Sequence, residues 1–180
     1  MKKSFSLIAI LAFMLTSCWS STDDVNLTKF EWNWFTLNIP KAWIKETSLP
    51  TPSSWKIELA LTSSEIKAWF ANNMVILWEK VVWETTSKKY GIVNYIRNTK
   101  DMVEFTKLNE ISATFPDKDE AIIYTFEAKY NNTTPKRKFL QLSKICWNYA
   151  YLTTIWINTD NDSVAKYENL LKSFTCTTKK

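Results

Sequence analysis

The chain has 180 residues, with 23 basic and 18 acidic side chains and a formal net charge of +5, which suits one domain with a substantial core. Histidine is absent and glycine occurs once, so His-based catalytic arrangements and glycine-rich phosphate loops are excluded. The basic residues are scattered, and the densest run is only 136–138. We therefore expect no nucleic-acid partner, no metal and no cofactor.

The N-terminus predicts a lipoprotein signal peptide at residues 1–17. Two lysines precede the apolar run 7–14, and the sequence Leu-Thr-Ser-Cys ending at Cys18 follows it, which is the order of a secretory signal. The ending resembles a bacterial lipobox, in which the cysteine becomes the lipidated first residue of the mature protein. The apolar run is too short to span a bilayer. We therefore predict lipid attachment at Cys18 and an extracytoplasmic, membrane-anchored location.

After the lipidated cysteine, the small and polar residues of 18–29 predict a flexible tether, and residues 30–180 predict a single domain. Alternating apolar and polar residues, bounded by turn-forming residues, predict a series of β-strands. Because most of these strands follow one another through short turns, they predict an antiparallel meander. The predicted strands are 35–39, 57–61, 70–77, 103–115, 121–130, 138–146 and 149–157.

Two helices are predicted among these strands. Residues 85–87 offer N-caps for a helix that ends at about residue 100, and residues 161–163 cap a second helix. Together with the strands they predict an α+β fold, a central antiparallel sheet of about six to seven strands flanked by two or three helices. The predicted apolar faces are Tyr90, Ile92, Val93 and Ile96 in the first helix, and Val164, Tyr167, Leu170, Leu171 and Phe174 in the second.

Two cysteines remain once Cys18 is assigned to the lipid. Cys146 and Cys176 form an even pair in a compartment where disulfides persist, which predicts a disulfide between them. Such a bond closes a loop of about 30 residues and stabilises the fold by roughly 3.6 kcal/mol on the chain-entropy estimate. The alternative is two separately buried thiols.

Tryptophan occurs ten times and glycine once, whereas average usage predicts about 12 glycines. Several tryptophans occupy positions typical of glycine: Trp147 in a two-residue turn between predicted strands, Trp83 before a helix start, and Trp19 after the lipidated cysteine. Some bacterial lineages read UGA as glycine, so we hypothesise that most of these tryptophans are glycines in the organism. The alternative is a Trp-rich protein that binds sugar or lipid through its aromatic rings.

Three motifs in a fixed order carry a resemblance to a known family. They are Phe35-x-Leu-x-Ile-Pro-x-x-Trp43, then Phe70-x-Asn-Asn-x-Val-Ile, then Tyr149-x-Tyr-Leu-Thr-Thr with Tyr167-x-x-Leu-Leu-x-Ser-Phe174. Their order and spacing over about residues 30–175 resemble the PsbP-like family. The resemblance implies a noncatalytic scaffold with a central antiparallel sheet flanked by helices. Because Pro-x-x-Trp recurs in that family, we expect Trp43 to be a true tryptophan.

Acidic residues cluster in two predicted turns. Asp117, Asp119 and Glu120 form one group, and Asp160 and Asp162 form the other. Carboxylate oxygens suit a weak Ca²⁺ site, but solvated turn and helix-cap acids are the much commoner explanation for such clusters. We therefore predict no metal site at either turn.

These observations predict a lipid-anchored binding or accessory module of the cell envelope that is not an enzyme. Its expected partners are the membrane, through lipidated Cys18, and a protein or envelope component of unknown identity. Two alternatives stay open: an envelope hydrolase that uses a carboxylate pair, and a carbohydrate- or lipid-binding lipoprotein that uses exposed aromatic residues. A concave pocket that holds two acids with perturbed pKa values would identify the hydrolase.

Overall fold

The computed structural model describes residues 27–32, 34–46, 56–67, 69–82, 84–160 and 163–177. The predicted signal peptide, the lipid-attachment residue Cys18 and most of the predicted tether lie outside these residues. The first strand, β1, spans Leu27–Glu31, so the end of the predicted tether belongs to the folded domain, which begins slightly before residue 30.

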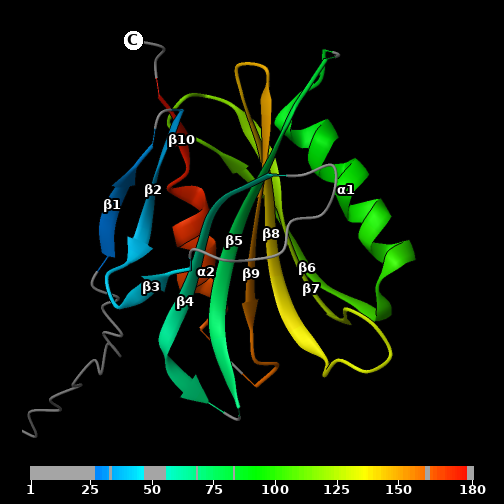
Figure 1. Cartoon of the computed structure of the whole chain (residues 1–180). Coiled ribbons are helices and arrows are strands. Elements are labelled where there is room, and N and C mark those ends of the chain that lie inside the picture. The colour runs from blue at the N-terminus through cyan, green and yellow to red at the C-terminus, as the bar shows by residue number, and fades with distance from the viewer. Residues whose placement is uncertain are drawn as a thin grey trace, which may run out of the picture.

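Seven strands of the described residues form one antiparallel sheet in the order β3-β4-β5-β9-β8-β7-β6 (Figure 1). This sheet and the two helices described below confirm the predicted α+β class and the predicted sheet of six to seven strands. The bounds of the strands are β3 Trp43–Lys45, β4 Lys56–Lys67, β5 Phe70–Lys80, β6 Val103–Thr114, β7 Glu120–Lys129, β8 Arg137–Cys146 and β9 Tyr149–Ile157.

A smaller sheet, which sequence patterns did not predict, lies with the second helix on one face of the main sheet. It has three strands in the order β1-β2-β10, with β2 at Phe35–Pro40 and β10 at Thr175–Cys176. The second helix, α2, spans Val164–Lys172. The main core lies between these elements and the large sheet, and its largest fully buried members include Phe35, Tyr151, Phe174, Leu140 and Leu142.

The other helix, α1 (Ser87–Asp101), packs on β7 and β8 at the opposite face of the main sheet (Figure 1). The hydroxyl of Thr86 caps it by accepting a hydrogen bond of 3.2 Å from the Lys89 N–H, as the sequence predicted for residues 85–87. Figure 1 shows α1 on one side of the sheet, away from α2 and the smaller sheet. The described residues contain no helix that is long and apolar enough to cross a membrane.

The predicted apolar face of α1 is wrong. Of that face only Tyr90 is buried, whereas Ile92, Val93 and Ile96 are 36%, 57% and 47% exposed. The helix instead turns a mixed face towards the sheet: Asn98 donates a side-chain N–H to Gln141 at 2.7 Å, and the ring of Tyr95 stacks on Tyr124 of β7 at 4.1 Å between ring centres. A stripe of apolar residues does not reveal such a mixed polar and aromatic face.

A disulfide joins Cys146, at the end of β8, to Cys176 in β10, which is the pairing that the sequence predicts. The two Cα atoms lie 5.4 Å apart, within the usual range for a disulfide. Because β10 pairs with β2, this bond links the smaller sheet to the main sheet. The loop that the disulfide closes contains β9 and α2, so the bond restricts the unfolded chain in the segment that places α2 on the main core.

Within the described ranges, four residues other than glycine have positive φ, and two of them are tryptophans: Trp69 at 60° and Trp147 at 61°. Both lie in two-residue turns, between β4 and β5 and between β8 and β9 respectively. At the second turn only the first central residue has positive φ, which is the type II′ pattern with its strong preference for glycine at that position. A bulky aromatic residue rarely adopts this conformation.

Candidate functional site: an apolar groove on the main sheet

The face of the main sheet that carries α1 is only partly covered by that helix. Alternate residues of β8 point to this face, so Phe139 lies on the same side as Gln141, which contacts α1. Trp156 of β9 pairs directly with Phe139, and Leu77 of β5 pairs with Ile57 of β4. Because α1 packs on β7 and β8, it does not cover the part of this face that β4, β5 and β9 form.

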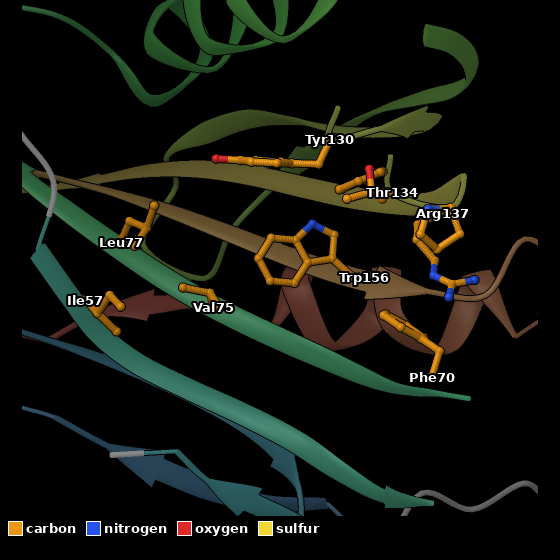
Figure 2. A pocket seen from close by; sticks show the side chains of 10 residues that line it. Ile57, Phe70, Val75, Leu77, Tyr130, Thr134, Arg137 and Trp156 are labelled. Carbon is orange, nitrogen blue, oxygen red and sulfur yellow. The ribbon is translucent and has the colours of Figure 1, made fainter. Parts of the chain in front are cut away.

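Side chains on this part of the face line a groove of about 550 Å³ (Figure 2). Its volume lies within the range of roughly 300–1,000 Å³ that is usual for small-ligand sites. Strands β4, β5, β8 and β9 supply most of the lining, and the loop between β7 and β8 supplies the rest. We call this feature the sheet groove; its lining residues are Ile57, Phe70, Val75, Leu77, Tyr130, Thr134, Pro135, Arg137, Phe139 and Trp156.

The sheet groove is elongated and has two different ends. Figure 2 shows Ile57 and Leu77 at one end and Arg137 beside Phe70 at the other, with Trp156 between them. Phe70 and Leu77 both belong to β5, and seven steps of about 3.3 Å separate them by roughly 23 Å. The groove is therefore long, with aliphatic side chains at one end and a guanidinium group at the other.

Arg137 is held in place by two contacts. One Nη donates a hydrogen bond of 3.0 Å to the Oδ1 of Asn158, and the guanidinium carbon lies 4.1 Å from the centre of the Phe70 ring. The amide of Asn158 in turn donates to the Lys67 carbonyl at 3.0 Å. The ion pairs of the described residues do not include Arg137. Its charge is thus positioned at the groove by a neutral amide and an aromatic ring.

The lining contains no carboxylate, and its ionisable side chains are those of Tyr130 and Arg137. General acid–base chemistry by a carboxylate pair needs two acids across a cleft. The sheet groove therefore lacks the arrangement that would identify the hydrolase alternative. What its side chains offer is apolar surface and one cationic hydrogen-bond donor.

The acidic cluster at 117–120 has a different role. The ammonium of Lys144, whose side chain is 0% exposed, contacts Asp117 Oδ1 at 2.8 Å and Asp119 Oδ2 at 2.9 Å. It also lies 4.4 Å from the centre of the Phe115 ring. Ser87 at the start of α1 donates to Asp119 and accepts from the Ile145 N–H at 2.8 Å. These carboxylates therefore neutralise a buried lysine and connect α1 to β8.

Burial raises the pKa of Asp117, but four other influences outweigh it. The hydrogen bond and charge of Lys144 and the backbone N–H groups of Asp119 and Cys176 all favour the carboxylate, so the pKa of Asp117 lies below its usual value. Asp117 is therefore a charged structural residue at neutral pH. It is not poised to exchange protons.

The other predicted acidic positions do not assemble into a site in the described part of the chain. Glu120 and Asp160 are exposed, and Asp162 lies outside the described residues. No group of three or more His, Cys, Asp or Glu side chains within the described ranges is arranged to hold a metal ion.

Sequence patterns missed the sheet groove, although one signal points to it. Residues 74–77 of β5 are all apolar, so this strand presents apolar side chains to both faces of the sheet. Met74 and Ile76 are fully buried in the main core, whereas Leu77, on the opposite face, lines the groove. A strand that is apolar on both faces indicates a second covered or binding surface.

The chain matches no protein-family model, and no curated protein matches its sequence. Its fold, however, recurs among solved structures. The solution structure of cyanobacterial PsbP (CyanoP) from Synechocystis sp. PCC 6803 superposes with a TM-score of 0.62 over 91% of this chain and 99% of that one, at 10% sequence identity. The chain has a PsbP-like fold. The fold resemblance predicted from the order of the sequence motifs is confirmed.

Two other solved structures are similar to this PsbP-like chain. The Ran-binding protein Mog1p from Saccharomyces cerevisiae has a TM-score of 0.54 at 9% identity and covers 84% of this chain and 95% of its own. PA94, a protein of unknown function from Pseudomonas aeruginosa, has a TM-score of 0.54 at 11% identity, and the match covers 82% of this chain and 94% of PA94. At these identities the likeness shows the fold alone, and a fold does not determine a function.

Proposed function

We propose that this protein is a binding or accessory module of the cell envelope, anchored outside the cytoplasm through lipid at Cys18, and that the sheet groove is its binding site. The observation that carries the proposal is the composition of the groove: a cavity of about 550 Å³ with a mostly apolar lining and a single positioned cation. Such a lining favours binding of an apolar ligand. It supplies no acid–base pair, so the proposed role is not enzymatic.

The fold neighbours support a binding role in a general way. Mog1p is a Ran-binding protein by name, and it achieves this on the same PsbP-like fold. The engagement of Asp117 and Asp119 with Lys144 also argues against a hydrolase that uses this acidic cluster, because a buried lysine already neutralises these two carboxylates.

Among the described residues, the exposed-aromatic alternative fits the structure best at the groove. Trp69 and Trp147 are exposed, but they lie beyond opposite ends of β5, since Phe70 begins that strand and Tyr149, next to the second turn, pairs with Lys80 at its end. Rings so far apart do not form one sugar-binding platform. Trp156, by contrast, lines the sheet groove beside other apolar residues.

The lipid anchor is tested by labelling intact cells with radioactive palmitate. We expect the full-length protein to take up label, to fractionate with membranes and to accumulate as an unprocessed precursor in the presence of globomycin. Cys18→Ala should lose both label and membrane attachment. A Cys18→Ala protein that stays labelled and membrane-bound would contradict the anchor.

The binding site is tested with N-phenyl-1-naphthylamine, a neutral apolar dye whose fluorescence rises on entering an apolar pocket. We expect the purified protein to bind the dye, and Leu77→Glu to weaken binding at least tenfold, because it places a charge in the groove lining. Ile44→Glu is the matched control, since Ile44 is an exposed residue of β3 outside the lining. Equal dye binding by both variants, or none by the wild type, would rule out the groove as the site.

We also propose that most of the ten tryptophans are glycines in the organism, read from UGA. The positive φ angles of Trp69 and Trp147 support this, because glycine adopts that conformation without steric cost. Trp43 packs near Tyr167, with ring centres 6.1 Å apart, which fits its expected status as a true tryptophan. The codons decide the matter: UGG at most of the ten positions would refute the proposal.

A further inference from the structure

We propose that the ligand of the sheet groove is a single alkyl chain that carries one anionic head group, of the fatty-acid class, with the head group bound by Arg137. This inference rests on the proposed function, because it takes the groove as the binding site and names what enters it. Three features of the groove carry it: its shape, the gradient of polarity along it, and the state of its one cation.

The shape of the groove favours an extended chain. The lining follows β5 for roughly 23 Å from Phe70 to Leu77, whereas its volume is about 550 Å³. A lining of this length has room for an extended alkyl chain laid along β5.

The lining of the groove is aliphatic at one end and polar at the other, which matches the apolar tail and polar head of an amphiphile. Ile57, Val75 and Leu77 form one end, as Figure 2 shows. An alkyl chain that lies against them is removed from water, and each buried methylene contributes up to about fourfold in affinity. Arg137 and Thr134 lie towards the other end (Figure 2). An apolar tail and a polar head would thus each meet a matching surface.

The cation at the polar end is positioned but not neutralised by an ion pair within the described residues. Asn158 accepts one of the five N–H donors of Arg137, and the Phe70 ring lies against its guanidinium carbon. The remaining donors form a planar fork that matches a carboxylate. Charge complementarity therefore selects an anionic head group over a neutral or cationic one.

The experiment measures displacement of N-phenyl-1-naphthylamine from the purified protein by amphiphiles of matched chain length. Decanoate should displace the dye at a concentration at least tenfold lower than decanol, and decyltrimethylammonium should be the weakest competitor. From octanoate to dodecanoate, each added methylene should tighten binding by up to about fourfold. Equal displacement by decanoate and decyltrimethylammonium would overturn the inference.

Variants of the cation separate this inference from the proposed function. Arg137→Gln should weaken decanoate binding at least tenfold more than it weakens dye or decanol binding, and Arg137→Lys should restore part of the loss. Lys56→Gln is the charge-matched control, because Lys56 lies against Trp78 outside the groove lining. Dye binding with no effect of Arg137→Gln on decanoate would refute the anionic head group but leave the binding site intact.

A vesicle arm tests the source of the chain. Phosphatidylglycerol vesicles are mixed with the protein, and co-sedimentation is compared with binding of monomeric decanoate. The inference predicts that monomeric decanoate binds whether or not vesicles are present. Attachment to the anionic vesicles that Arg137→Gln abolishes, without any binding of monomeric decanoate, would overturn it in favour of docking on a membrane surface.

Discussion

Lys144 is the residue on which several elements of the fold converge. Its ammonium is fully buried, yet it contacts two carboxylates that are partly open to water. Loss of a carboxylate partner is costly here, because a buried ammonium without a counter-charge destabilises the fold far more than a partly hydrated carboxylate does. The stability of the fold therefore depends on pH through the ionisation of Asp117.

The first prediction concerns that dependence. The pKa of Asp117 is lower in the folded protein than its unfolded value of about 4. The stabilisation that the ionised carboxylate gives the fold is therefore fully present above about pH 4, and it is lost as the pH falls through the folded pKa. Asp117→Asn should therefore lower the free energy of unfolding by about 1–3 kcal/mol at pH 7. The difference from the wild type should shrink as the pH falls below about 4.

Urea denaturation at a series of pH values measures this difference, with the exposed Asp160→Asn as the control that should change little. A stability difference for Asp117→Asn that grows as the pH falls would contradict the assigned role of Lys144.

The second prediction concerns the left-handed tryptophan in the turn after β8. Trp147→Gly should raise the free energy of unfolding by about 1 kcal/mol, because a bulky residue at φ 61° is strained where glycine is not. The loss of the hydrogen bond of 3.3 Å from its indole to the Thr177 carbonyl offsets part of this gain.

Trp78→Gly is the comparison for the turn variant. Its ring packs edge-on against Tyr149 at 5.3 Å, so its removal should lower the free energy of unfolding by about 2 kcal/mol or more. Chemical denaturation of both variants measures the contrast. A destabilised Trp147→Gly would show that this turn is built for tryptophan.

At the scale of elements, α1 shows where sequence periodicity fails. Its most apolar residues, Ile92, Val93 and Ile96, face outwards, whereas Gly91 and Asn94 face the sheet. Periodicity identifies a buried face when the opposing surface is apolar. Here the opposing part of β8 presents Gln141 and Ser143, whose partners are polar or small, and only the folded chain reveals that surface. The α2 face was predicted correctly because it packs on the apolar main core.

The third prediction follows from this orientation of α1. Ile96→Lys should change the free energy of unfolding by less than about 0.5 kcal/mol, as for most exposed sites. Gly91→Leu should lower it by about 1–3 kcal/mol, because a Cβ at this position would already be in van der Waals contact with the Cβ of Ser143, at 3.6 Å, and the rest of a leucine side chain would overpack this contact between α1 and β8. Thermal or urea unfolding measures both. A strongly destabilised Ile96→Lys would contradict this orientation and would mean that Ile96 lies on the buried face of α1, as its apolar periodicity indicates.

At the scale of the molecule, the presence of most strands and the disulfide partners were accessible from the sequence, but the placement of β9 beside β5, which a simple meander does not predict, and the binding surface were not. Most strands were predictable because local alternation and turn residues specify them. The disulfide was predictable because Cys146 and Cys176 are the two cysteines that remain once Cys18 is assigned to the lipid. The sheet groove depends on side chains from β4, β5, β8 and β9, whose adjacency comes from β9 returning between β5 and β8. Arg137 acquires its role only because that return places Asn158 beside it.

The most direct test of the central claim, that the sheet groove is the binding site, is a map of chemical-shift changes as decanoate is added to the isotope-labelled protein. We predict that the largest changes fall on the groove-lining residues Val75, Leu77, Arg137 and Phe139, while residues of α2 and the smaller sheet stay unchanged. Largest changes on the outer face of α1 or at the edge strand β6, with the groove residues unmoved, would contradict the account.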